Sequence, residues 1–149
     1  MRGPARRRSP NLLLMLGALA AMLLGTFVDV FSSEFQSISP EELKKLIETK
    51  ANTFVVDVQP KIAYEIGHIK GAINFPWESE IKGPVALPKD TLLILYCDCA
   101  DEEDSTHMAE QLSKEWGYKR GNIKLLKGGW SGWLKMGYPV DKKIGEKGK

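Results

Sequence analysis

The sequence is poor in cysteine: its 149 residues include only two, Cys97 and Cys99. Because these lie so close together, they cannot cross-link distant parts of a fold, which excludes a disulfide-stabilised scaffold. Surplus positive charge is also missing from most of the chain. Once the four arginines and the single acid of residues 1–31 are set aside, 17 basic and 18 acidic residues remain. A domain without a basic field has no electrostatic basis for binding nucleic acid.

The chain has no internal repeat, and its length suits one domain with an appendage at the N-terminus. Residues 1–10 contain four arginines and no acid, whereas residues 12–28 contain no charge at all. A positive segment followed by an apolar run is the layout of a signal peptide or a membrane anchor. The whole uncharged stretch, residues 9–28, approaches the roughly 20 residues of a spanning helix, and no clear cleavage site follows it. We therefore expect residues 1–31 to be an uncleaved anchor.

The arginines before the apolar run also predict how the chain is oriented. Positive flanks stay on the cytoplasmic side of a membrane, so the domain after the anchor should be extracytoplasmic, in the periplasm. Secretion after cleavage of a signal peptide is the alternative, and a buried core helix is a third interpretation. We expect a domain over residues 32–140 and a charged, flexible tail over residues 141–149.

Beyond the N-terminal segment, apolar patterns of strand and helix type alternate along the chain. The strongest helix start is Ser39-Pro40-Glu41-Glu42, which combines a capping residue, a proline at the first helical position and a capping box. Strands are predicted at residues 35–38, 54–58, 92–96 and 123–126, with a short one within 67–76. Helices are predicted from residue 40 to about 50 and at 105–116 and 130–136, with shorter helical segments at 62–65 and 77–81. Such alternation predicts an α/β fold with a parallel sheet covered on both faces.

One stretch combines these elements with a reactive group. The apolar strand at residues 92–96 ends at Cys97, a short polar loop follows, and a helical pattern begins at Ser105. In open α/β sheets, ligands bind beyond the carboxyl ends of the strands. A helix N-terminus that faces a cysteine lowers the pKa of the thiol and favours the reactive thiolate. Cys97 is therefore the candidate nucleophile.

Four segments in order along residues 35–140 make the chain resemble a single-domain rhodanese. They are VVDV at 55–58 with Glu65 after it, GHIKGAINFP at 67–76, LYC at 95–97 before a loop and helix, and LKGG at 126–129 with Trp133, Gly137, Pro139 and Val140. The resemblance implies a five-stranded parallel sheet flanked by helices, here preceded by the hydrophobic anchor. It also implies sulfur transfer: Cys97 takes a sulfane sulfur from a donor such as thiosulfate, becomes a persulfide, and passes the sulfur to a thiol or protein acceptor. No metal or cofactor is implied.

The loop after Cys97 departs from the pattern of that family. Family members usually have a loop rich in glycine and arginine, and this loop has neither. The loop and helix-start residues are Asp98, Cys99, Ala100, Asp101, Glu102, Glu103, Asp104 and Ser105. Negative charge disfavours the thiolate and repels thiosulfate, so we expect poor thiosulfate activity and a cationic or protein-borne acceptor. Some of these acids also fit the ordinary preference of helix starts for carboxylates.

Two further departures concern single positions. Gln59 follows the VVDV segment, where an arginine is common in the family. Phosphatase and arsenate-reductase relatives on this fold need an arginine six residues after the cysteine to bind the oxyanion, and Glu103 occupies that position. Oxyanion chemistry of that kind is therefore not expected.

Cys99 permits three interpretations. It is a resolving thiol that closes an internal disulfide with Cys97, a ligand of a soft metal site with nearby carboxylates and His107, or a small buried apolar residue. His107, in the first turn of the predicted helix, is either a base that assists Cys97 or a surface residue. The leading hypothesis is a sulfurtransferase acting through a Cys97 persulfide. The alternatives are a catalytically silent binding module and a Cys97–Cys99 thiol–disulfide redox protein.

Overall fold

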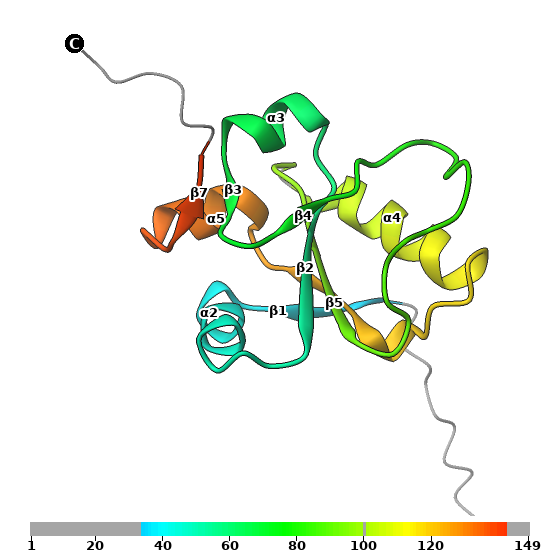
Figure 1. The fold of residues 1–149 in the computed structure, drawn as a ribbon, viewed down its shortest axis with the longest axis horizontal. Coiled ribbons are helices and arrows are strands. Elements are labelled where there is room, and N and C mark those ends of the chain that lie inside the picture. Colours follow the sequence, from blue (N-terminus) through cyan, green and yellow to red (C-terminus); the bar gives the residue numbers. More distant parts are fainter. Residues whose placement is uncertain (1–33, 100, 143–149) are drawn as a thin grey trace, which may run out of the picture. The chain divides into compact units, whose positions relative to one another are not determined.

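The computed structural model of the chain describes residues 34–99 and 101–142 (Figure 1). The predicted anchor at residues 1–31, the loop residue Ala100 and most of the predicted tail, residues 143–149, lie outside the described residues. Within the described ranges, no helix is long and apolar enough to cross a membrane.

A five-stranded parallel sheet forms the centre of the fold, in the order β1-β6-β5-β2-β4. The strands are β1 (Gln36–Ile38), β2 (Thr53–Asp57), β4 (Ile73–Asn74), β5 (Leu92–Tyr96) and β6 (Ile123–Leu126). The predicted α/β fold with a five-stranded parallel sheet is thus confirmed. β5 lies in the middle of the sheet, so the residues that follow it emerge at the centre of the edge formed by the strands' carboxyl ends.

Helices cover both faces of this sheet (Figure 1). On one face lie α2 (Pro40–Glu48) and α5 (Gly129–Lys135), and on the other lies α4 (Glu103–Lys114). The remaining elements are α3 (Lys61–Ile66), a 3-10 turn (Arg120–Asn122), and the strands β3 (His68–Ile69) and β7 (Val140–Asp141), which pair antiparallel as a separate small sheet.

Alternation along β5 divides the core into two parts. Leu93 and Leu95 face α4 and pack in the same cluster as Met108 and Leu112, whereas Tyr96 belongs to the cluster of α2 and α5 on the opposite face. The period of two in a strand places Cys97, the next residue, on the α4 side, and Cys97 is indeed part of the α4 cluster. The side chain of Cys97 therefore points toward the start of α4.

The predicted start of α2 is confirmed in detail. Ser39 caps the helix: its Oγ accepts a hydrogen bond from the Glu42 backbone N–H at 3.2 Å, and the Glu42 carboxylate accepts one from the Ser39 backbone N–H at 2.9 Å. Together these two bonds satisfy donors that a helix start otherwise leaves open.

One predicted helix is shifted in the structure and another is absent. α4 begins two residues before Ser105, because Glu102 adopts the left-handed conformation (φ 56°) and lets the helix start at Glu103. The predicted helix at residues 77–81 was wrong. Its backbone groups bind a side chain of α4 instead: Gln111 accepts from the Ile81 N–H at 3.0 Å and donates to the Ser79 carbonyl at 3.0 Å.

Candidate active site

Cys97 lies directly after β5 and is only 1% exposed. Its Sγ is 3.8 Å from the Oγ of Ser105, a buried residue in the first turn of α4. The Ser105 hydroxyl donates to the Glu102 carbonyl at 2.8 Å, which fixes its position beside the sulfur. The sequence analysis placed Cys97 and Ser105 in one site, and the structure brings them together.

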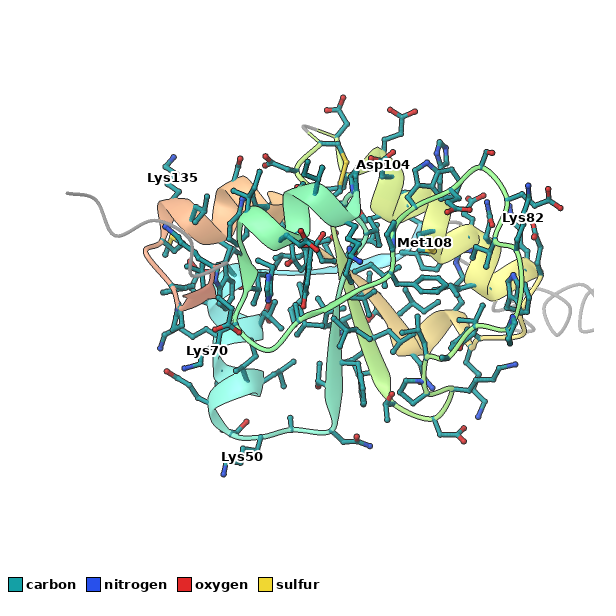
Figure 2. The ribbon with its side chains drawn as sticks, turned by 45° about the horizontal axis from the view of Figure 1, so that its top comes forward. Lys50, Lys70, Lys82, Asp104, Met108 and Lys135 are labelled. Carbon is teal, nitrogen blue, oxygen red and sulfur yellow. A yellow bond between two sulfur atoms is a disulfide. The ribbon has the colours of Figure 1, made fainter. Side chains whose placement is uncertain are left out.

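Cys97 and Cys99 are joined by a disulfide, with their Cα atoms 5.5 Å apart. Figure 2 shows the sulfur–sulfur bond in yellow near the labelled Asp104, at the N-terminal end of α4. Of the three interpretations of Cys99, the structure shows the internal disulfide. Cys99 itself is partly exposed and packs at the margin of the α4 cluster. In the described part of the chain, no group of three His, Cys, Asp or Glu side chains is arranged to hold a metal ion.

The turn between β6 and α5 holds the cysteine from the other side. The Trp130 backbone N–H donates to the Cys97 carbonyl at 2.8 Å. This close approach requires glycine at position 129, where φ is +51° and a Cβ would overlap the Cys97 carbonyl oxygen. The sequence predicts a turn at the Gly128-Gly129 pair, which also belongs to the family resemblance. Its physical role is to let two loops meet at the cysteine backbone.

Two of the loop acids have structural partners. The Glu102 carboxylate accepts from the Gly128 N–H at 2.9 Å, and the Glu102 N–H donates to the Cys99 carbonyl at 3.3 Å. Asp98, between the two cysteines, accepts from the Ser131 hydroxyl at 2.5 Å. These carboxylates connect the cysteine loop to the β6–α5 turn and the start of α5, and no pattern in the sequence indicates those long-range pairs.

The remaining acids are arranged around the loop. Asp101 and Glu103 are exposed and Asp104 is half-buried. Asp101 and Glu102 line a cavity of about 490 Å³ whose wall also includes Glu110 of α4. Arg120 also lines this cavity, so the acids share it with one cation.

His107 is exposed on α4, and its ring lies 5.4 Å from that of Trp77. Trp77 in turn packs on the α4 cluster, as Cys99 does. The contact that the structure gives His107 is therefore with an aromatic side chain at the edge of the site. This position matches the interpretation as a surface residue better than that as a base beside Cys97.

A buried polar network lies beneath the site. Asp57, at the end of β2, is fully buried and accepts hydrogen bonds from the Tyr96 hydroxyl at 2.7 Å and the Gln59 N–H at 2.8 Å. The Val58 N–H donates to the Tyr96 carbonyl at 3.0 Å, which links this network to the residue before Cys97. Burial raises the pKa of Asp57, although the Tyr96 and Gln59 hydrogen bonds oppose this shift. Burial and the neighbouring Asp57 carboxylate raise the pKa of Tyr96.

A second cavity, of about 410 Å³, adjoins the cysteine loop at Asp98. It lies between α3 and α5, and apolar side chains form part of its wall. Its lining includes Gln59, Ile66, Asp98, Trp130, Leu134 and Lys142. The hollow combines apolar side chains with a carboxylate, an amide and the cation Lys142, a mixture found in sites for small organic molecules.

The rhodanese-like domain family matches residues 39–136, which include every element from α2 to α5. The chain belongs to this family. It is 30% identical over 115 residues to the thiosulfate sulfurtransferase GlpE of Pseudomonas paraeruginosa, an alignment that covers 77% of the chain and 97% of that protein. It is similar in fold to a protein of Bacillus halodurans, with a TM-score of 0.63, 23% identity and coverage of 93% and 92% of the two chains.

Other relatives of this rhodanese-like chain have different names. An HTH-type transcriptional regulator of Mycobacterium tuberculosis is 32% identical over 116 residues, which cover 76% of the chain and 48% of the regulator. The human M-phase inducer phosphatase 2 is 36% identical over 95 residues, covering 55% of the chain and 16% of the phosphatase. The chain spans about half the length of the regulator and a smaller part of the phosphatase, so membership of the family does not by itself select one activity.

Proposed function

We propose that this protein is a sulfurtransferase that carries sulfane sulfur as a persulfide on Cys97. The observation that carries the proposal is the position of Cys97 after the central strand, with its Sγ 3.8 Å from the Ser105 Oγ at the start of α4. In the reduced protein, the partial positive charge of the helix start favours the thiolate, which is the nucleophilic form. The similarity to GlpE along nearly its full length supports the same chemistry.

The charge of the loop sets the class of donor and acceptor in this proposal. Thiosulfate is a dianion, and it would approach past Asp98, Asp101 and Glu102. Coulomb repulsion raises the free energy of that encounter, so thiosulfate turnover is slow. The acceptor is a thiol or a protein with a cationic surface. The same charges weigh against phosphatase chemistry, because no arginine stands in residues 98–104 to bind an oxyanion.

The disulfide favours a second candidate, thiol–disulfide redox work by Cys97 and Cys99. A catalytically silent binding module is the third candidate.

The location we propose is the extracytoplasmic side of a membrane, with residues 12–28 as the anchor. If this segment is cleaved as a signal peptide, the domain is secreted instead. An oxidising compartment is also where a disulfide persists. Added protease tests this location: it should spare the domain in intact cells and digest it in sealed spheroplasts, whose outer face is exposed, whereas protection in sealed spheroplasts would contradict it.

The test of the activity uses the full-length chain, which is first reduced with a dithiol and then separated from the excess dithiol. It is mixed with thiosulfate or with benzenethiosulfonate, a sulfane-sulfur donor that carries one negative charge instead of two. Release of sulfite or benzenesulfinate reports the transfer of sulfur to the protein. We expect faster release from benzenethiosulfonate, and none from the Cys97→Ala variant whose fold is verified by its urea midpoint. Equal release by Cys97→Ala, or none by the wild type with either donor, contradicts the proposal.

A further inference from the structure

We propose that Cys99 resolves the Cys97 persulfide within the same chain, so that the protein releases the sulfur as sulfide and closes the Cys97–Cys99 disulfide. This inference rests on the proposed function, since it begins with the persulfide on Cys97. It makes the protein a persulfide reductase that needs a dithiol to complete each cycle, and not only a carrier that hands on intact sulfane sulfur.

The first observation is the disulfide itself and the backbone that permits it. The two Cα atoms are 5.5 Å apart, within the usual 4.4–6.8 Å range for bridged cysteines. The backbone on either side is held in this arrangement by the bond from Trp130 N–H to the Cys97 carbonyl and by that from Glu102 N–H to the Cys99 carbonyl. The bonded loop therefore keeps Cys99 within bonding distance of the sulfur that would carry the persulfide.

The second observation is the difference in exposure between the two cysteine residues. Cys97 is 1% exposed, whereas Cys99 is partly exposed. A persulfide on buried Cys97 is less accessible to an acceptor in solution than to Cys99, whose thiol lies two residues away. In the closed disulfide, the partly exposed Cys99 is the sulfur that an incoming thiolate can reach.

The third observation is the charge of the loop. A persulfide at neutral pH is largely an anion, and here it would stand beside Asp98, with Asp101 and Glu102 nearby. Sulfide release replaces that anion with a neutral disulfide, and the departing hydrosulfide is repelled by the same carboxylates. The acids that make thiosulfate a poor donor thus favour the resolving step.

The steps balance as follows. The Cys97 thiolate attacks the outer sulfur of the donor, and the donor's sulfur–sulfur bond breaks to release sulfite or a sulfinate. The outer sulfur of the persulfide takes a proton from water, the Cys99 thiolate attacks the Cys97 Sγ, and a new bond forms between the two cysteines as the bond to the sulfane sulfur breaks. Hydrosulfide leaves with that proton and the electron pair of the broken bond. Two thiols are oxidised to a disulfide and sulfane sulfur is reduced to sulfide. A dithiol attacks Cys99, displaces the Cys97 thiolate and restores both thiols.

The experiment compares the reduced full-length wild type with the matched variants Cys99→Ser and Cys97→Ser, each given benzenethiosulfonate without added reductant. Benzenesulfinate reports the first step and sulfide reports the second, while intact mass reports the state of the protein. We expect about one sulfinate and about one sulfide per wild-type chain, with formation of the disulfide. Cys99→Ser should release sulfinate, gain one sulfur, and yield less than about a tenth of the sulfide until a dithiol is added. Cys97→Ser should release neither product.

The outcomes separate the inference from the proposed function. If the wild type keeps its persulfide as stably as Cys99→Ser and releases no sulfide, the resolving role is wrong and the sulfur carrier stands. If no chain releases sulfinate, the sulfur carrier is wrong and the resolving role falls with it. If Cys99→Ser does not fold, as judged by its urea midpoint under reductant, Cys99→Ala replaces it with the same expected products.

Discussion

Replacing Gly129 by alanine tests how the β6–α5 turn supports the cysteine loop. The backbone at this position has a φ of +51°, and an added Cβ would overlap the Cys97 carbonyl oxygen and lie 3.2 Å from the carbonyl carbon. A left-handed conformation costs a non-glycine residue roughly 1–2 kcal/mol. Relieving the overlap separates the two loops and breaks the bond from Trp130 N–H to the Cys97 carbonyl, a further loss of roughly 0.5–1.5 kcal/mol. We expect Gly129→Ala to lower the free energy of unfolding by about 1.5–3.5 kcal/mol.

Gly137→Ala is the matched control, because Gly137 has a φ of +67° and no atom within 4 Å of the position of a Cβ. It bears the conformational cost alone, so it should be less destabilised than Gly129→Ala by about 1 kcal/mol. Urea unfolding of both reduced variants measures this difference as a gap of about 0.3–1 M between midpoints. Equal midpoints for the two variants would refute the claim that the Gly129 backbone and the Cys97 carbonyl need their close approach.

Four other substitutions test the site and its surroundings. The folded state raises the pKa of Asp57 above the ordinary 3.8, so the folded protein holds a proton that the unfolded chain releases. The wild type should therefore lose stability relative to Asp57→Asn as the pH rises from 3.8 through the raised pKa. Urea unfolding along a pH series measures this loss, and parallel stability curves for the two proteins would contradict it. Asp98→Asn keeps a hydrogen-bond acceptor for Ser131 but removes one negative charge. It should therefore increase the rate of sulfite release from thiosulfate roughly two- to five-fold at low salt, with a smaller gain at high salt. A wild-type rate that does not depend on salt would count against repulsion between the loop acids and thiosulfate. Met108→Ala should lower the free energy of unfolding by about 2–5 kcal/mol, because Met108 is fully buried. His107 is exposed, so His107→Ala should leave the rate of sulfinate release unchanged. A large fall in that rate would instead support the interpretation of His107 as a base.

The sequence predicted the elements that local patterns govern. The apolar runs of β5 and β6 appear with the predicted bounds, and the capping box of α2 forms as expected. The strand–cysteine–helix order also located Cys97 at the carboxyl end of the sheet. These features depend on residues close in sequence, so periodicity and capping chemistry are enough to find them.

The missed features depend on contacts between distant residues. The Gln111 side chain of α4 occupies backbone groups near residue 80, and this competes with the predicted helix there. The strand at Val140–Asp141 forms only because His68–Ile69 pairs with it, although Asp141 was expected in the tail. The pairs Glu102–Gly128 and Asp98–Ser131, which turn two loop acids into structural groups, likewise join residues 26 and 33 positions apart.

The choice among interpretations of Cys99 also needed the structure. A Cys-x-Cys spacing is compatible with a metal ligand pair, a resolving thiol or a packed apolar residue, and no nearby residue in the sequence selects among them. The disulfide and the unequal exposure of the two cysteine residues support the resolving role that we propose. It also changes the expected chemistry, because the protein must be reduced before Cys97 can accept sulfur.

The most direct test of the central claim is the intact mass of the reduced Cys99→Ser chain after exposure to benzenethiosulfonate, followed by peptide mapping. In this variant no neighbouring thiol removes the persulfide. The account predicts a gain of about 32 Da that a dithiol reverses and that maps to the peptide containing Cys97. An unchanged mass in a folded chain, or a sulfur mapped to another residue, would contradict the assignment of Cys97 as the sulfur carrier.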